Sequence, residues 1–287
     1  MARVSRLLIP AMAAVVVLGG GALAYTGLDL TPTVAYKAGP SAQEMAAIRW
    51  EKDADALDAA LKKVKGSFSV AFLDARTGET YEYKGSAKYD TASIVKADIL
   101  ACTLLKAQDA GRTISSAEMN LAKPMIQLSD NDATTALFQR IGGKPAVTKC
   151  NKTLGLTATT IDVRWGLTRT TAEDQVKLLS QFDGKDSPLD EESQETAFDL
   201  MTGVDEEQDW GVPVVATEGE TATVKNGWDT RTADGGKWVV NTIGRVTSED
   251  EDVDVSLVVL SRSNLSQDNG MKLVEKVAKL TRKYLKY

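Results

Sequence analysis

The spacing of hydrophobic positions changes along the chain, and each spacing predicts a different element. In residues 53–65 the apolar positions fall three or four residues apart, as they do on one face of a helix. Residues 67–75 alternate between apolar and other side chains, 76–78 form a turn sequence, and 79–83 regain strand character. The first part of the folded chain is therefore predicted to be a helix followed by a β-hairpin.

A long apolar segment follows the hairpin. Residues 93–110 are almost continuously apolar or small and are followed by Gly111, which predicts a buried helix with a glycine stop signal. Further helical segments are expected at 116–123, 124–128 and 132–141. The middle of the chain is thus predicted to contain helices and loops.

Strand character returns only near the end of the chain. Three segments, 221–225, 237–246 and 253–261, are predicted strands, and the apolar spacing in 271–284 predicts a final helix. Two early strands, three late strands and a helical insert between them favour an α+β fold. We expect a five-stranded antiparallel sheet flanked by the terminal helices, with an all-helical lobe beside it.

The N-terminus has the pattern of an export signal. Two arginines precede an apolar run over residues 7–24, which ends in the small-x-small sequence Ala22-Leu23-Ala24. We predict a cleaved signal peptide at 1–24, with an uncleaved membrane anchor as the alternative, and a secreted or cell-envelope location. Residues 25–50 contain little periodic hydrophobicity and are predicted to be a mobile linker, which leaves 51–287 as one domain.

Composition removes several classes of function. The net charge of −6 argues against nucleic acid as a partner. The chain contains no histidine, so a Ser-His-Asp or Cys-His nucleophile cannot be present, and a zinc hydrolase site is disfavoured. We expect no metal and no cofactor. A nucleophilic serine here would need a lysine or a carboxylate as its base.

One Ser-x-x-Lys sequence, Ser93-Ile94-Val95-Lys96, opens the predicted buried helix. Residues three apart lie on one helical face, so the Lys96 amine could reach the Ser93 hydroxyl. A serine N-cap followed by an incidental lysine is the structural alternative. The apolar neighbours of Lys96 favour a functional lysine, because a solvated lysine is difficult to place among them.

Two further motifs are weak when taken singly. Ser129-Asp130-Asn131 lies between predicted helices, where the same residues could simply cap the next helix. Lys225-Asn226-Gly227 ends a predicted strand, but Lys37-Ala38-Gly39 fits the same Lys-x-Gly pattern. Their order along the chain is more informative than either motif alone.

The three motifs together resemble the signature of the class A β-lactamase and penicillin-binding superfamily, which is Ser-x-x-Lys, Ser-Asp-Asn and Lys-Thr-Gly. The resemblance extends over about residues 50–287. It implies a nucleophile at Ser93, its base at Lys96, a proton relay at Ser129 and an orienting lysine at Lys225 that also attracts a substrate carboxylate.

The resemblance also implies a substrate-binding set. Asn131 would hold the acyl side chain, and the backbone N–H groups of Ser93 and Trp228 would form the oxyanion hole. Asn226 and Gly227 complete the set as the remaining residues of the third motif. Trp228 could equally be a core aromatic at the end of a strand.

One part of the family pattern is missing. Members deacylate with a glutamate in an Ω-loop, and the corresponding residues 161–171 contain a single carboxylate, Asp162, which we interpret as a capping or salt-bridging residue beside Arg164. The sequence therefore predicts a serine hydrolase or acyl-transfer enzyme for a β-lactam or a D-alanyl peptide-like substrate, with poor deacylation. A non-catalytic envelope binding module with the same fold is the alternative.

Two properties stay open at this level. Cys102 and Cys150 could form a disulfide, as exported proteins often do, or remain two buried thiols. The expected partner is a small-molecule or peptidoglycan-like substrate, with a possible N-terminal membrane anchor, and the sequence does not define the oligomeric state.

Overall fold

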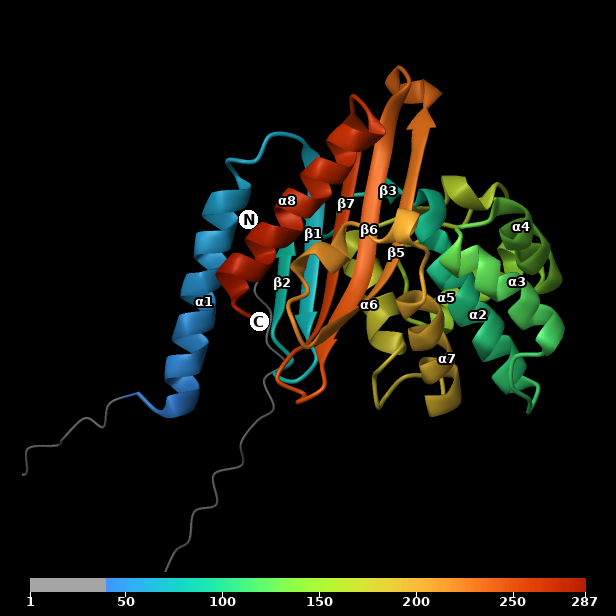
Figure 1. The fold of residues 1–287 in the computed structure, drawn as a ribbon, viewed down its shortest axis with the longest axis horizontal. Coiled ribbons are helices and arrows are strands. Elements are labelled where there is room, and N and C mark those ends of the chain that lie inside the picture. Colours follow the sequence, from blue (N-terminus) through green and yellow to red (C-terminus); the bar gives the residue numbers. More distant parts are fainter. Residues whose placement is uncertain (1–39) are drawn as a thin grey trace, which may run out of the picture.

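The computed structural model describes residues 40–287, which form a five-stranded antiparallel sheet with helices on both faces (Figure 1). The strand order is β2-β1-β7-β6-β5. The strands are β1 (Ser67–Asp74), β2 (Thr80–Tyr83), β5 (Glu220–Arg231), β6 (Lys237–Ser248) and β7 (Asp254–Asn264). The predicted fold class is confirmed, including the split of the sheet between the two ends of the sequence.

The terminal helices cover one face of the sheet. Helix α1 (Ala42–Leu61) packs beside α8 (Gln267–Leu285), and α8 lies across β6 and β7 (Figure 1). The core between these layers is fully buried at Leu57, Leu257 and Val277. Burying these side chains stabilises the fold by roughly 1.5–3 kcal/mol each.

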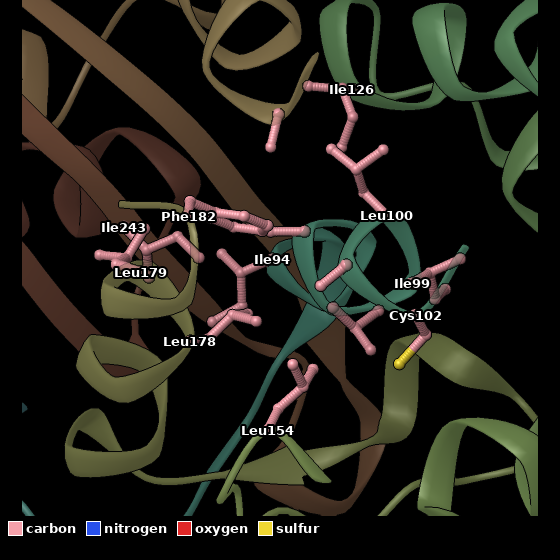
Figure 2. Close-up of a cluster of buried hydrophobic side chains, with 14 of the residues drawn as sticks. Ile94, Ile99, Leu100, Cys102, Ile126, Leu154, Leu178, Leu179, Phe182 and Ile243 are labelled. Carbon is pink, nitrogen blue, oxygen red and sulfur yellow. The ribbon is translucent and has the colours of Figure 1, made fainter. Parts of the chain in front are cut away.

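The opposite face carries the helical lobe. Helix α2 (Val95–Asp109) runs through its centre and is buried on nearly every side. The surrounding helices are α3 (Ser116–Gln127), α4 (Asn131–Arg140), α5 (Gly143–Thr153), α6 (Ala172–Gln181) and α7 (Glu191–Thr202). Figure 2 shows side chains from α2, α6 and the sheet meeting in this second core, including Leu100, Leu178, Phe182 and Ile243.

Short strands and 3₁₀ turns lie between the five-stranded sheet and the helical lobe, next to α2. Strands β3 (Tyr89–Asp90) and β4 (Arg169–Thr170) form a second, two-stranded sheet, and they are too short to produce a periodic sequence signal. The 3₁₀ turns are η1 (Ala92–Ile94), η2 (Trp165–Leu167), η3 (Glu206–Gln208), η4 (Val212–Val215) and η5 (Thr232–Asp234). The β3–β4 pair joins the segment before Ser93 to the segment that contains residues 161–171.

The predicted linker at 25–50 is wrong over its last part. Helix α1 begins at Ala42, where the Ser41 side chain accepts from the Glu44 backbone N–H and the Glu44 carboxylate accepts from the Ser41 N–H. Residues 42–49 are largely exposed. This part of the helix buries no apolar face, and the prediction relied on the periodic apolar positions that such a face produces. The signal peptide predicted at 1–24 and the linker at 25–39 lie outside the described residues.

Two element boundaries also differ from prediction. Helix α3 continues through Pro124, so the segments expected at 116–123 and 124–128 are one helix. Strand β5 does not end at the Lys225-Asn226-Gly227 motif but pairs with β6 as far as Arg231. The motif therefore lies in the middle of an edge strand, where it is held on one side by the full β5–β6 ladder.

A disulfide joins Cys102 on α2 to Cys150 on α5, a pairing that the sequence left open. Closing a loop of 48 residues by a disulfide stabilises a fold by roughly 4 kcal/mol in the chain-entropy model. Within residues 40–287, no helix is both long and apolar enough to cross a membrane.

Candidate active site

Ser93 lies in the η1 turn that leads into α2, at the boundary between the sheet and the helical lobe. Its side chain is half-buried, and the preceding residue, Ala92, has a φ of +45°. Positive φ is uncommon for residues other than glycine, and such strain persists only where the surrounding packing enforces it. The serine is thus held by its surroundings rather than by local helix preference.

Lys96 is fully buried, and its amine contacts the second motif rather than Ser93. Its Nζ donates to the Ser129 carbonyl oxygen at 2.5 Å, to Ser129 Oγ at 3.0 Å and to Asn131 Oδ1 at 2.9 Å. Among residues 40–287, no group hydrogen-bonds the Ser93 hydroxyl. The expected direct Ser93–Lys96 hydrogen bond is therefore replaced by a bond from Lys96 to Ser129, which itself has a φ of +57°.

Lys225 reaches the same hydroxyl from the sheet. Its Nζ donates to Ser129 Oγ at 3.1 Å and to the Asn226 carbonyl oxygen at 3.0 Å, and its side chain is 1% exposed. Two buried lysines from different layers therefore converge on one serine. We call Lys96, Ser129 and Lys225 the lysine cluster.

The environment of the lysine cluster disfavours charge on both amines. Burial lowers the pKa of Lys96 to about 7, although the negative charge of Asp130 opposes the shift. Burial and, secondarily, the positive charge of Lys96 lower the pKa of Lys225 well below its ordinary value. Loss of water around an ammonium group destabilises the charged form, which makes a neutral amine accessible near neutral pH.

Asp130 has a different role from its two neighbours. Its side chain accepts from the Ala133 N–H at 2.7 Å and caps α4. The capping interpretation is therefore correct for Asp130, while Ser129 and Asn131 contact Lys96. Capping fixes the start of α4 and so fixes the two residues that contact the lysine.

Gly227 lets β5 pass very close to the serine turn. A Cβ at this position would lie 2.7 Å from the Ser93 nitrogen and 2.6 Å from the Ile94 nitrogen, closer than real side chains approach. Because β5 is an edge strand, alternate backbone groups of β5 point away from β6. This close approach places the Ser93 and Trp228 backbones on neighbouring segments, as an oxyanion hole requires.

The side chains of Asn226 and Trp228 point away from the lysine cluster. Successive residues of a strand face opposite sides, and Lys225 occupies the side facing the helical lobe. Asn226 Nδ2 donates to the Gln208 and Trp210 carbonyl oxygens, at 2.8 and 2.9 Å. The Asn226 side chain is 1% exposed and ties β5 to the η3 segment. The predicted contact of Asn226 with substrate therefore stays a prediction for its backbone groups.

The ring of Trp228 lies on the same side of β5 as the Asn226 side chain. It packs edge-on against Trp210, with the ring centroids 5.7 Å apart, next to the core under the terminal helices. Of the two interpretations left open by the sequence, the structure favours the packed aromatic for the side chain. Only the backbone N–H of Trp228 remains a candidate for contact with substrate.

Residues 161–171, the short loop, lie beside the lysine cluster, and the Gly166 carbonyl oxygen accepts from Arg231 at the end of β5 at 3.1 Å. The half-buried Trp165 lies over Lys96, with Nζ 5.0 Å from the ring centroid, and its Nε1 donates to Thr135 Oγ1 at 3.1 Å. The short loop is further tied down by the Thr91 N–H, which donates to the Thr168 carbonyl oxygen at 2.8 Å. An aromatic ring thus lies beside the buried lysine, a contact that spacing along the sequence did not reveal.

The carboxylate of the short loop serves the loop itself. Asp162 Oδ1 accepts from the Arg164 N–H at 2.8 Å and lies 3.8 Å from the Arg164 guanidinium. This agrees with the capping and salt-bridging role inferred for Asp162. Within residues 40–287, no carboxylate forms an ion pair with Lys96, and no cluster of acidic or cysteine side chains is arranged to hold a metal ion.

The sheet with its edge strand β5, the buried Ser-x-x-Lys helix and a second serine shared by two lysines form the arrangement that the β-lactamase motifs predict. The family model for the β-lactamase enzyme family matches residues 118–285, and the chain belongs to this family. That range includes Ser129 and Lys225 and begins after Ser93. A search of the curated proteins gives no match.

Solved structures with the same fold include three informative neighbours. The extended-spectrum β-lactamase TLA-1 aligns with a TM-score of 0.71 and 19% identity, covering 82% of this chain and 99% of that chain. A class A β-lactamase from Bacteroides cellulosilyticus gives 0.68 and 18%, covering 83% and 98%. PBP-A gives 0.69 and 17%, covering 82% and 96%. The neighbours include both β-lactamases and a protein named as PBP, and they establish the fold.

Proposed function

We propose that this protein is an exported acyl-transfer enzyme in which Ser93 is acylated by a β-lactam or a D-alanyl peptide-like substrate. The observation that carries the proposal is the pair of buried amines, Lys96 and Lys225, on the single hydroxyl of Ser129. Burying an ammonium group costs several kcal/mol, so a merely structural role would not account for two such groups at one hydroxyl. Proton transfer does account for them.

The proposed acylation step uses these groups as follows. Ser93 Oγ attacks the substrate carbonyl carbon, and its proton passes to the neutral amine of Lys96. The negative charge that develops on the carbonyl oxygen is held by the Ser93 and Trp228 N–H groups. When the C–N bond breaks, the Ser129 hydroxyl donates a proton to the leaving nitrogen and recovers one from the lysines beside it.

The same residues suggest how substrate is held. The Lys225 amine can donate to the carboxylate that penicillins and D-alanyl peptides both carry, and the negative charge of that carboxylate would favour protonation of Lys225. Asn131 Oδ1 accepts from Lys96, which leaves the amide NH₂ of Asn131 to bind the acyl side chain. A negatively charged amide substrate fits these groups.

Deacylation lacks a comparable set of groups. A positioned base typically contributes about 10²–10⁴-fold to a proton-transfer step, and the only carboxylate of the short loop, Asp162, is engaged with Arg164. In the same loop the Trp165 ring lies 5.0 Å from Lys96 Nζ and supplies no base for a hydrolytic water. We therefore propose that the acyl-enzyme is long-lived and that hydrolysis is slow.

Labelling with a fluorescent penicillin tests the nucleophile. We expect one adduct per chain, located by peptide mapping on Ser93 and absent from Ser93→Ala. Ser86→Ala, which removes an exposed serine close by in the sequence, is the matched control and should label like the wild type. Labelling of Ser93→Ala at the wild-type level would overturn the proposal, and absence of any adduct with penicillins and D-alanyl thioesters would favour a binding module.

Export is part of the same proposal, and it rests on the sequence of residues 1–24. N-terminal sequencing of the protein recovered from the cell envelope should begin near Tyr25. An intact Met1 in that fraction would show that residues 1–24 are not cleaved and would favour a membrane anchor.

A further inference from the structure

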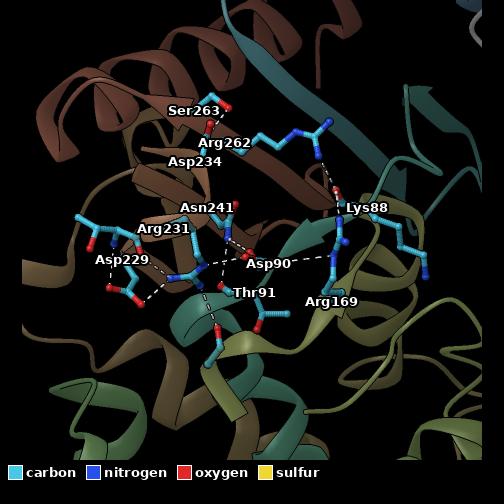
Figure 3. A network of polar contacts seen from close by, with 12 residues as sticks. Lys88, Asp90, Thr91, Arg169, Asp229, Arg231, Asp234, Asn241, Arg262 and Ser263 are labelled. Atoms are coloured by element: carbon cyan, nitrogen blue, oxygen red, sulfur yellow. Dashed lines mark hydrogen bonds and ion pairs between the residues drawn. The ribbon is translucent and has the colours of Figure 1, made fainter. Parts of the chain in front are cut away.

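A cavity of about 450 Å³ lies beside β3 and β4, outside the lysine cluster. Its wall includes Tyr89 and Asp90 from β3, Arg169 from β4, Arg231 from the end of β5 and Arg262 from β7. Figure 3 shows the three arginine side chains directed toward this region from separate elements. None of the residues assigned above to acylation lines the cavity.

Two guanidinium groups converge on one neutral acceptor in this cavity. Arg169 Nη2 and Arg262 Nη1 each lie 3.4 Å from the Lys88 carbonyl oxygen (Figure 3). The exposed Arg262 forms no ion pair with any carboxylate of residues 40–287, and its guanidinium carbon stands 5.3 Å from the centroid of the Tyr89 ring. The Arg262 Nε also donates to Ser67 Oγ at 3.3 Å, whereas its Nη2 has no hydrogen-bond partner within residues 40–287. Stacking on an aromatic ring orients an arginine for binding.

The carboxylates nearby pair with Arg231 and Arg169 but not with Arg262. Asp90 is shared, with Oδ1 3.4 Å from Arg169 Nε and Oδ2 2.6 Å from Arg231 Nε. Asp234 accepts from the Ser263 hydroxyl at 2.6 Å instead of pairing with Arg262. Arg231 also pairs with Asp229, so two carboxylates serve Arg231 and Arg169. Arg262 is the arginine of this cavity that forms no ion pair within residues 40–287, in a chain whose overall charge is −6.

We propose that this cavity binds a phosphate group. A planar guanidinium presents paired donors that match phosphate oxygens, and a tetrahedral anion can accept from two guanidiniums at once. The anion would sit between Arg169 and Arg262, where it would satisfy N–H groups that now share one carbonyl oxygen at 3.4 Å. Free phosphate and the phosphodiester of an anionic envelope polymer share this chemistry.

Titration calorimetry with inorganic phosphate at low ionic strength tests the site. We expect saturable binding of one phosphate per chain, weakened by roughly tenfold in Arg262→Gln and in Arg169→Gln, because each change removes charge-assisted hydrogen bonds. Arg49→Gln is the matched control: Arg49 is exposed on α1, far from the cavity lining, and its loss should leave the affinity unchanged. Binding should persist in Ser93→Ala, which separates this result from the proposed acyl transfer.

The two sources of phosphate are distinguished by a second titration with a glycerol phosphate oligomer. Tighter binding of the oligomer, lost in the same two variants, assigns the site to a polymer, whereas equal affinity assigns it to the free anion. The proposal is overturned if no saturable binding occurs. It is also overturned if both arginine variants bind phosphate as the wild type does, because the anion would then be held elsewhere, for example at the lysine cluster.

Discussion

The lysine cluster and the short loop flank the same serine turn but differ in chemical content. In the cluster, two buried amines and one hydroxyl form a continuous hydrogen-bonded set. In the short loop, an indole ring faces Lys96 and the single carboxylate is turned to its own backbone. In the proposed mechanism, the site is equipped for the first half of acyl transfer and poorly equipped for hydrolysis of the product. The two halves of the reaction would then depend on separate parts of the fold.

The largest expected effect comes from removing the base on the cluster side. Lys96→Ala should slow acylation of Ser93 by about 10²–10⁴-fold, the usual contribution of a positioned base. Lys96→Met, which retains most of the buried bulk, should behave in the same way if the amine rather than packing is responsible. Rates of penicillin labelling measure both, with Lys106→Ala, an exposed lysine of α2, as control. Wild-type rates in folded Lys96→Met would remove Lys96 from the mechanism.

A pair of glycine substitutions compares the two regions directly. Gly227→Ala forces a methyl group against the Ser93 and Ile94 nitrogens, so β5 must move and acylation should fall by about 10²-fold. Gly166→Ala in the short loop meets open space and should change acylation by less than about twofold. Labelling rates and thermal unfolding of both variants are the measurements. If the two substitutions changed acylation equally, the close approach of β5 to the serine turn would not be important for catalysis.

The pH dependence of the acylation rate tests the lysine cluster and not the short loop. Because burial lowers the pKa of Lys96 to about 7, the neutral amine increases as pH rises through that value. The acylation rate should therefore climb by about tenfold per pH unit below the pKa and level off above it. A stopped-flow profile from pH 5 to 9 measures this. A rate that falls as pH rises through 7 would require the charged amine and would contradict its role as base.

The smallest effect is expected in the short loop. Asp162→Asn should change the lifetime of the acyl-enzyme by less than about twofold, because the carboxylate caps the Arg164 N–H and half-exposed pairs contribute little. The lifetime is measured by intact mass after removal of excess penicillin. A lifetime prolonged by tenfold or more would identify Asp162 as a deacylation base.

Much of the fold could be predicted because periodicity is a local property. The alternation at 67–83 and the apolar run at 93–110 correspond to β1, β2 and the η1–α2 helix within a few residues. The start of α1 carried a different signal, the Ser41-x-x-Glu44 capping box, which does not depend on apolar spacing. The two-residue strands β3 and β4 have no such signal, because their pairing is made only by tertiary packing.

The geometry of the site was harder to predict from the sequence than the fold. Spacing placed Ser93 and Lys96 on one face of a helix, but it could not show that the Lys96 amine turns to Ser129, more than thirty positions away. Strand alternation places the side chain of Asn226 on the face of β5 opposite Lys225, but the sequence could not show that this side chain is buried against the Gln208 and Trp210 carbonyl oxygens. The position of Trp165 could not be predicted either, because it depends on how the short loop folds back over α2.

Time-resolved intact mass during reaction with a penicillin tests the central claim most directly. With enzyme and penicillin at comparable concentrations, we expect the Ser93 adduct to form completely and then persist after free penicillin is removed, with negligible product release over the same period. Hydrolysis of a chromogenic cephalosporin, followed in parallel, should show one turnover and then stop. Sustained multiple turnover by the wild type, with no adduct detectable, would contradict the account, because it would mean that the short loop activates water as well as the lysine cluster activates Ser93.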